Sequence, residues 1–152
     1  LGEGSMKKVI VISLLAVLVL AGCGNVKDGA STPKIKDVLK EQTGQNGRAC
    51  VRISDINGYG YQNNVITIDG RRNYYLATTV MRCNAMNTAV AARFEGPSGY
   101  EICGGGSSKI RSGGDTCTIS QIFEFESREV AFAALDTADT KLKELQEAVK
   151  AE

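Results

Sequence analysis

The sequence contains no histidine and no tryptophan, and it has only two prolines. Without histidine the chain cannot build a Ser-His-Asp triad or a Cys-His pair, and it offers no imidazole ligand to a metal ion. These absences exclude the commonest forms of nucleophilic catalysis and of zinc binding. We therefore predict that the protein is not an enzyme, with no catalytic residue and no metal site.

An excess of charge of either sign is also missing. Lysine and arginine total 18 residues, and aspartate and glutamate total 17. Lys7, Lys8 and Glu3 are the charged residues of the segment 1–22, so the rest of the chain carries no net charge. A neutral protein does not attract nucleic acid over long distances. We therefore predict no nucleic-acid partner.

The first part of the chain has the composition of an export signal. Residues 1–5 precede Met6, and we expect them not to belong to the natural protein. Lys7 and Lys8 are followed by an apolar run over residues 9–20, broken only by Ser13. This run is short of the roughly 20 residues that a membrane-spanning helix needs. Two lysines, a short apolar run and small residues after it predict a signal peptide over residues 1–22.

The signal ends in Leu20-Ala21-Gly22-Cys23, which resembles the lipobox of bacterial lipoproteins. In that family the cysteine sulfur is joined to diacylglycerol, the signal is cut before the cysteine, and the new amino group is acylated. The resemblance implies that Cys23 is the first mature residue and carries the lipid that anchors the protein to a membrane. Because Gly24 rather than aspartate follows, it implies an outer-membrane lipoprotein facing the periplasm, or the outer face of the cell membrane in a Gram-positive host.

The remaining cysteines are even in number. Once Cys23 is set aside, Cys50, Cys83, Cys103 and Cys117 remain. An even set in an exported chain predicts two disulfides. Zinc binding is the alternative, but no Cys-x-x-Cys pair occurs, and we expect no cofactor other than the covalent lipid.

Between the cysteines the sequence has the pattern of a small β domain. Short apolar stretches alternate with turn signals such as Asn57-Gly58, Asp69-Gly70 and Gly96-Pro97-Ser98-Gly99. This pattern predicts a small antiparallel β-barrel or sandwich stapled by two disulfides. The expected strands cover residues 50–56, 65–68, 72–79, 89–95, 100–103, 109–111 and 117–125.

The order of these strands favours one of the three possible disulfide pairings. If consecutive strands run as a meander, the first and the seventh begin at the same end of the sheet. Cys50 then lies near Cys117, and Cys83 lies near Cys103 at the other end. We therefore expect the nested pairs Cys50–Cys117 and Cys83–Cys103.

Helices are predicted on both sides of the β region. Apolar residues at helical spacing follow Thr32-Pro33 and predict a short helix over residues 33–42. A longer pattern predicts a helix over residues 127–151 that packs along the barrel, or alternatively serves self-association. The expected organisation is a signal peptide (1–22), a flexible tether (23–31), a β domain with its leading helix (32–126) and a C-terminal helix (127–152).

The β region also resembles a family of uncharacterised bacterial exported domains of unknown function. The likeness rests on Cys50-Val51-Arg52-Ile53, on the stretch Gly70-Arg71-Arg72-Asn73-Tyr74-Tyr75-Leu76, and on the three later cysteines. These motifs are structural, so the resemblance implies a stapled β domain and transfers no chemistry.

Four residues are candidates for a binding loop. Tyr59 and Tyr61 lie among glycines and asparagines, and Arg71 and Arg72 follow a hairpin signal. We predict a non-enzymatic envelope lipoprotein that binds another envelope component, such as a protein. The alternatives are an inhibitor of a secreted or periplasmic hydrolase, which plugs a cleft with a rigid loop at 58–64 or 104–108, and a histidine-free enzyme.

Overall fold

The computed structural model describes residues 31–151 with the exception of residue 89. The predicted signal peptide, Cys23 and all but the last residue of the predicted tether lie outside the described residues. The following description concerns the compact unit Thr32–Glu152.

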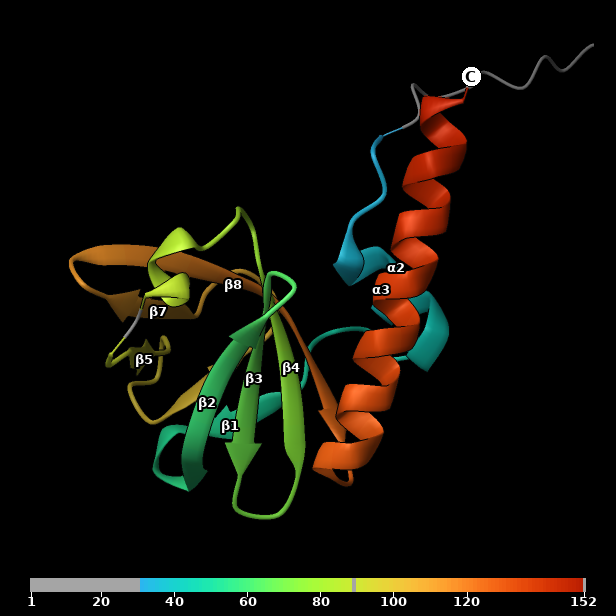
Figure 1. Cartoon of the computed structure of the whole chain (residues 1–152). Helices are drawn as coiled ribbons and strands as arrows, with labels where there is room; N and C mark the ends of the chain where they lie inside the picture. The colour runs from blue at the N-terminus through green and yellow to red at the C-terminus, as the bar shows by residue number, and fades with distance from the viewer. Residues whose placement is uncertain (1–30, 89, 152) are drawn as a thin grey trace, which may run out of the picture. The chain divides into compact units, whose positions relative to one another are not determined.

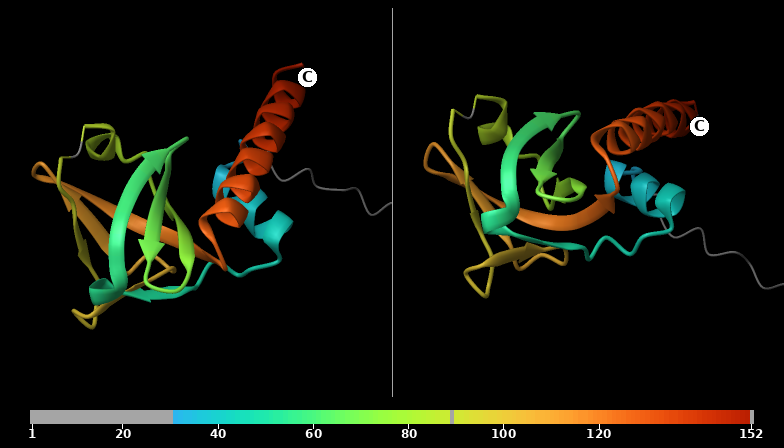
Figure 2. Two further views of the ribbon diagram at one scale, coloured as in Figure 1. Left: turned by 60° about the horizontal axis from the view of Figure 1, so that its bottom comes forward. Right: turned by 90° about the horizontal axis from the view of Figure 1, so that it is seen from below.

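Six antiparallel strands form a curled sheet, which confirms the prediction of a small stapled β domain (Figure 1). The order of the strands is β2-β3-β4-β8-β7-β5. Figure 2 shows that the sheet bends around on itself as a half-barrel. The strands are β2 (Ile56–Gln62), β3 (Val65–Gly70), β4 (Tyr74–Thr79), β5 (Arg93–Glu95), β7 (Lys109–Ser112) and β8 (Asp115–Phe125).

Two further strands form a separate ribbon. Strand β1 (Cys50–Arg52) pairs in an antiparallel manner with β6 (Glu101–Cys103). Just before β1, residues 47–49 run alongside β8: the Ala49 amide donates to the Ile122 carbonyl and the Ile122 amide donates to the Gly47 carbonyl. The chain therefore passes β8 before it crosses to β6, and β1 does not join the six-stranded sheet.

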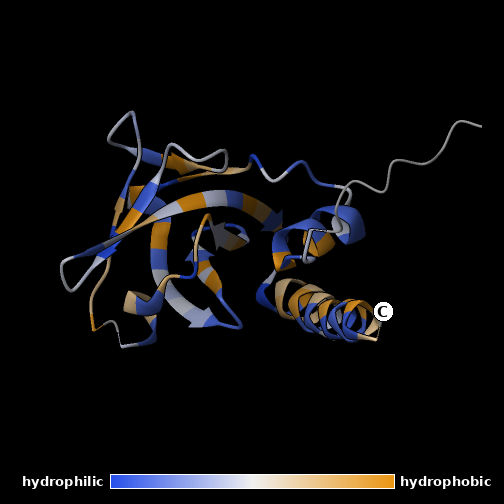
Figure 3. Ribbon diagram, turned by 90° about the horizontal axis from the view of Figure 1, so that it is seen from above, coloured by the Kyte–Doolittle hydropathy of each residue, from blue (hydrophilic) through white to orange (hydrophobic). Residues whose placement is uncertain are grey.

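The central strands are buried on both faces. Along β4, Tyr75 and Ala77 face a core inside the half-barrel, whereas Tyr74 and Leu76 face a second core on the outside of the sheet. This alternation follows from the two-residue period of a strand, and the hydropathy colouring of Figure 3 shows such alternation along the strands. A sheet covered on both sides buries residues on both faces, and β3 accordingly buries its first four residues in succession, Val65, Ile66, Thr67 and Ile68.

Two helices cover the outer core (Figure 2). Helix α2 (Ile35–Thr43) buries Val38 and Leu39 and ends at Gly44, whose φ of 68° suits glycine. Helix α3 (Arg128–Lys150) begins at the N-cap Ser127, whose hydroxyl accepts a hydrogen bond from the Val130 amide. The predicted apolar stripe of α3 packs against α2 and the sheet, with Ala131, Leu135 and Ala138 buried.

The packing of α3 confirms the predicted helix beside the barrel, while self-association stays a prediction. Within residues 31–151, leaving out residue 89, no helix is long and apolar enough to cross a membrane.

Two turns differ from the sequence prediction. Asn57 and Gly58 belong to β2, where the pairing with β3 contains a bulge, and they do not form a turn. The turn between β2 and β3 is instead Asn63-Asn64, and both residues have positive φ values, of 53° and 63°. Asparagine tolerates this conformation, which the tight turns of hairpins require. The connection between β3 and β4 is residues 71–73, one step beyond the predicted Asp69-Gly70.

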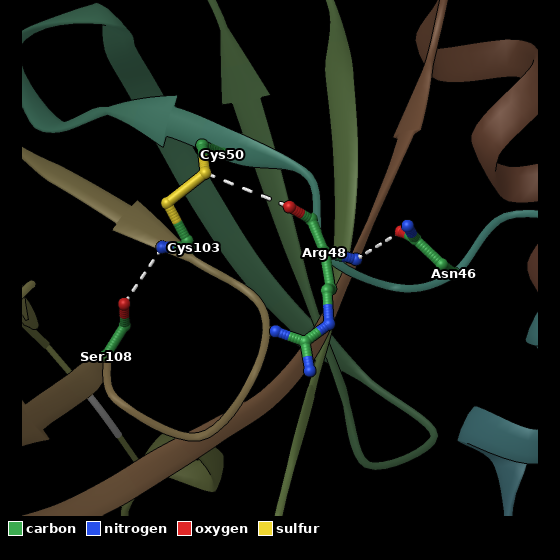
Figure 4. Close-up of a disulfide and its surroundings, with 5 residues drawn as sticks. All are labelled: Asn46, Arg48, Cys50, Cys103 and Ser108. Atoms are coloured by element: carbon green, nitrogen blue, oxygen red, sulfur yellow. Dashed lines mark hydrogen bonds between the residues drawn. A yellow bond between two sulfur atoms is a disulfide. The ribbon is translucent and has the colours of Figure 1, made fainter.

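The predicted disulfide pairing is wrong. The two bonds join Cys50 to Cys103 and Cys83 to Cys117. The prediction assumed that consecutive strands pair, but β1 pairs with β6, so that Cys50 lies directly opposite Cys103 (Figure 4). Cys83 follows β4, whose last residue pairs with Ile119, and it therefore meets Cys117 on the same strand β8.

Candidate functional site

Arg71 and Arg72, two of the predicted binding residues, lie at the edge of a polar pocket of about 390 Å³. We call it the arginine pocket. It forms where the β3–β4 connection meets β1 and the short 3-10 helix η1 (Ile53–Asp55). The pocket is lined by Cys50, Val51, Arg52, Asp55, Arg71, Arg72, Asn73, Tyr75 and Glu101.

Asp55 holds two of the three arginines of the pocket. Its Oδ2 atom lies 3.1 Å from Nε of Arg52, and its Oδ1 atom lies 3.4 Å from Nη2 of Arg71. The aspartate side chain is only 19% exposed, whereas the arginine side chains are 68% and 67% exposed. Each guanidinium carries five N–H donors, so both keep donors free for an anionic group from outside.

The inner wall of the pocket is fixed by Glu124. Its carboxylate accepts a hydrogen bond from the side-chain amide of Asn73, and its Oε1 atom lies 3.4 Å from the hydroxyl of Tyr75. Burial and the nearby Glu124 charge raise the pKa of Tyr75 above its ordinary value. The hydroxyl therefore stays protonated at neutral pH and remains a donor in the wall of the pocket.

A group of potential metal ligands borders the same pocket. One ligand atom each from Cys50, Glu101 and Cys103 lies within 4.8 Å of the others. The two cysteines are bonded to each other, so they offer no thiolate to a metal ion. The arrangement at this edge is therefore a disulfide beside a carboxylate.

Tyr59 and Tyr61 do not belong to an exposed loop, which corrects the prediction for these two candidates. Both lie on β2 and pack against the inner core. The Tyr59 hydroxyl accepts a hydrogen bond from the Ala92 amide, and its ring meets Phe94 edge-on at 5.6 Å. Tyr59 therefore links β2 to the segment around β5, the two edges of the curled sheet, and it is not brought together with the arginine pocket.

The glycine loop 104–108 is held tightly to the domain. The Gly104 amide donates to the Ala49 carbonyl, and the Gly105 amide donates to the Ser120 carbonyl. The Ser108 hydroxyl accepts from the Cys103 amide at 2.8 Å (Figure 4). Segment 58–62 lies in strand β2 and residues 63–64 form the turn that follows it, while the glycine loop is bound to its neighbours at Gly104, Gly105 and Ser108. The inhibitor role of these two segments stays a prediction.

Several residues of the arginine pocket escaped the sequence prediction. Arg52 and Asp55 are three residues apart and of opposite charge, a local signal that could have been noticed. Glu101 could not have been found in the same way, because it enters the pocket only through the pairing of β1 with β6. The sequence predicts Tyr75 on a strand, but its position beside Glu124 depends on the pairing of β4 with β8.

Comparison with known proteins places the chain in a family. No curated protein and no solved structure matches the chain. The model of one protein family, described as a family of unknown function (DUF6491), matches residues 6–141, which is most of the chain. The matched range includes the predicted signal peptide as well as both disulfides and the arginine pocket. The protein therefore belongs to the DUF6491 family of unknown function.

Proposed function

We propose that the protein is an exported lipoprotein whose half-barrel is a non-enzymatic binding module for another component of the cell envelope. In this proposal the lipid on Cys23 anchors the chain, and the arginine pocket takes an acidic group of an envelope protein. The location that best fits Gly24 after the cysteine is the outer membrane, with the domain facing the periplasm.

The cysteines support the export part of the proposal. Four of the five cysteines form two disulfides within the β domain, and disulfides persist in oxidising compartments. The fifth, Cys23, stands at the end of the signal-like segment in a lipobox-like sequence. Lipidation explains the single cysteine at position 23, and export explains the two disulfides formed by the other four.

One observation carries the binding part: a single half-buried carboxylate holds two mostly exposed arginines in place. Guanidinium groups bind carboxylates through paired N–H donors, and fixing their position beforehand lowers the entropy that binding costs. Arg72 adds a third cation to the same pocket. An acidic side chain or chain terminus of a partner protein fits this donor arrangement.

The anchor is tested by the mass of the protein isolated from membranes of its native host. We expect a chain that begins at Cys23 and carries diacylglycerol and an acyl group, and a Cys23→Ala variant that lacks both. A mature protein that still begins at Met6 would contradict the export proposal.

The binding role is tested by crosslinking in intact cells followed by identification of the bound proteins. Arg71→Glu reverses one charge of the arginine pocket, and Arg93→Glu reverses an exposed charge on β5 as the matched control. We expect one envelope protein to be captured by the wild type and by Arg93→Glu but lost with Arg71→Glu. Equal capture by all three proteins would reject the arginine pocket as the binding site.

A further inference from the structure

A second surface lies at the other end of the sheet. The β3–β4 connection and the arginine pocket stand at one end of these strands, and the Asn63-Asn64 turn and the end of β4 stand at the opposite end. There a groove of about 500 Å³ runs between α2, α3 and the end of β4. We call it the N-terminal groove. Its lining residues are Thr32, Pro33, Lys34, Ile35, Lys36, Asn63, Asn64, Thr78, Thr79, Val80, Met81, Arg82, Leu142 and Gln146.

The charges of the N-terminal groove are all of one sign. Lys34, Lys36 and Arg82 line it, and no aspartate or glutamate does. None of the three makes a salt bridge within the described part of the chain. The chain from Cys23 onward is neutral as a whole, so this groove concentrates positive charge locally.

Apolar side chains are exposed beside these cations. Met81 is 79% exposed and Val80 is 55% exposed, both in the segment that leaves β4. Exposed apolar residues next to lysine and arginine are typical of surfaces that rest on a lipid bilayer, because the apolar groups enter the interface and the cations meet lipid phosphates.

The length of the chain before the groove brings this surface close to a membrane. Thr32 and Pro33 belong to the groove, and nine residues separate Pro33 from Cys23. Ten peptide steps reach at most about 35 Å, whatever path the chain takes. A lipid on Cys23 would therefore hold the groove near the bilayer, and such confinement makes even a weak contact effective.

We infer that the surface formed by Lys34, Lys36, Val80, Met81 and Arg82 contacts the anionic phospholipid headgroups of the membrane that holds Cys23. This inference rests on the lipidation proposed above. The proposed contact directs the arginine pocket, at the opposite end of the sheet, away from the bilayer and toward a partner. The contact sets the orientation of the domain, while the lipid sets its attachment.

Because the chain has no tryptophan, a single introduced tryptophan reports on the contact without background. The lipidated protein carrying Met81→Trp is mixed with vesicles of phosphatidylcholine alone or of phosphatidylcholine with phosphatidylglycerol. The matched control is Tyr100→Trp, an aromatic exchange at a 62% exposed site on the β5–β6 turn. We expect the tryptophan fluorescence of Met81→Trp to shift to the blue on the anionic vesicles and to be quenched by brominated lipids. Tyr100→Trp should show neither effect.

Charge reversal provides a second measurement. Lys34→Glu with Arg82→Glu in the Met81→Trp protein removes two cations of the surface, and Arg93→Glu with Lys109→Glu is the control pair on β5 and β7. Each cation strengthens binding to an anionic surface about fivefold, so we expect contact to weaken at least about 25-fold for the first pair only. The inference is overturned if the fluorescence of Met81→Trp does not shift at saturating anionic lipid. It is also overturned if both charge-reversal pairs weaken the contact equally.

Anchoring is scored separately, by flotation with the vesicles. Protein that floats while its Met81→Trp variant shows no shift would leave the lipid anchor intact and reject the contact surface. Protein that carries no lipid when isolated from its native host, but whose Met81→Trp variant still shows the shift at saturating anionic lipid, would support the contact surface and contradict the anchor. The two proposals therefore fail in different ways.

Discussion

Cys50 of β1 lies directly opposite Cys103 of β6, and a disulfide joins them across this short antiparallel pair. The bond closes a sequence separation of 53 residues, and the second bond, between Cys83 and Cys117, closes one of 34 residues. In the loop-entropy model each cross-link of this size stabilises a folded domain by about 4 kcal/mol. The ribbon of β1 and β6, with three residues in each strand, therefore depends on its disulfide.

Removing cysteines in matched pairs distinguishes the observed bonds from the predicted ones. Cys50→Ala with Cys103→Ala removes one bond, and we expect a loss of about 4 kcal/mol in the free energy of unfolding with no free thiol. Cys50→Ala with Cys117→Ala breaks both bonds and leaves two thiols that react with a thiol-specific dye. Thiol counts and urea denaturation measure both effects. Free thiols in the first variant and none in the second would support the nested pairing instead.

Gly104 cannot be replaced without moving the backbone. A Cβ atom built at this position lies 1.8 Å from the Gly47 carbonyl oxygen, so Gly104→Ala must push the glycine loop away from residues 47–49. We expect a loss above about 2 kcal/mol, in the range of overpacked core positions. Gly58→Ala is the control, because no atom lies within 4 Å of its added Cβ, and we expect a change within about 0.5 kcal/mol. Similar urea midpoints for both variants would contradict the expected clash.

Ser127 determines where α3 begins. Its hydroxyl accepts a hydrogen bond from the Val130 amide at 3.3 Å, which pairs one of the free amides of the first turn. Ser127→Ala should therefore reduce the free energy of unfolding by about 1 kcal/mol, and Ser127→Asp should retain most of it. The measurement is thermal or urea unfolding followed by circular dichroism. An aspartate variant as unstable as the alanine variant would argue against capping.

The raised pKa of Tyr75 predicts a loss of stability at alkaline pH. The folded protein holds the phenolic proton more tightly than the unfolded chain. The contribution of protonated Tyr75 to the free energy of unfolding is therefore complete below the ordinary tyrosine pKa of about 10. It is lost as the pH rises from that value through the higher pKa of the folded state. Tyr75→Phe should remove this part of the alkaline decline, while Tyr100→Phe, at an exposed site, should leave it unchanged. Urea midpoints between about pH 8 and about pH 11 provide the measurement.

The sequence predicted the elements of this fold better than their pairing. The β-rich domain, the short leading helix and the long C-terminal helix follow from local apolar periods, and all three are confirmed. The Asn63-Asn64 turn could also have been predicted, because two asparagines between apolar runs favour positive φ values. The β1–β6 pair could not, since nothing local to residues 50–52 indicates a partner some 50 positions later.

The residues of the candidate site were likewise predicted only in part from local sequence. Arg71 and Arg72 are predicted from their place after a hairpin signal, and both line the arginine pocket. Tyr59 and Tyr61 came from the same kind of reasoning, but the period of β2 places them on the inner core. Glycines beside aromatic residues suggested a loop, whereas here they belong to an edge strand with a bulge.

Strands β3 and β4 contribute residues to both cores, so a truncated or cleaved chain cannot keep one core and lose the other. If α3 is lost through an early stop codon or a proteolytic cut, the sheet loses the cover of its outer core. This loss would uncover Leu76 and Phe123, both fully buried, on the outer side of the sheet. Such a fragment would be recognised as misfolded and degraded. Cells should therefore contain the complete protein or none of it, and quantitative proteomics of nonsense mutants would show no stable remnant.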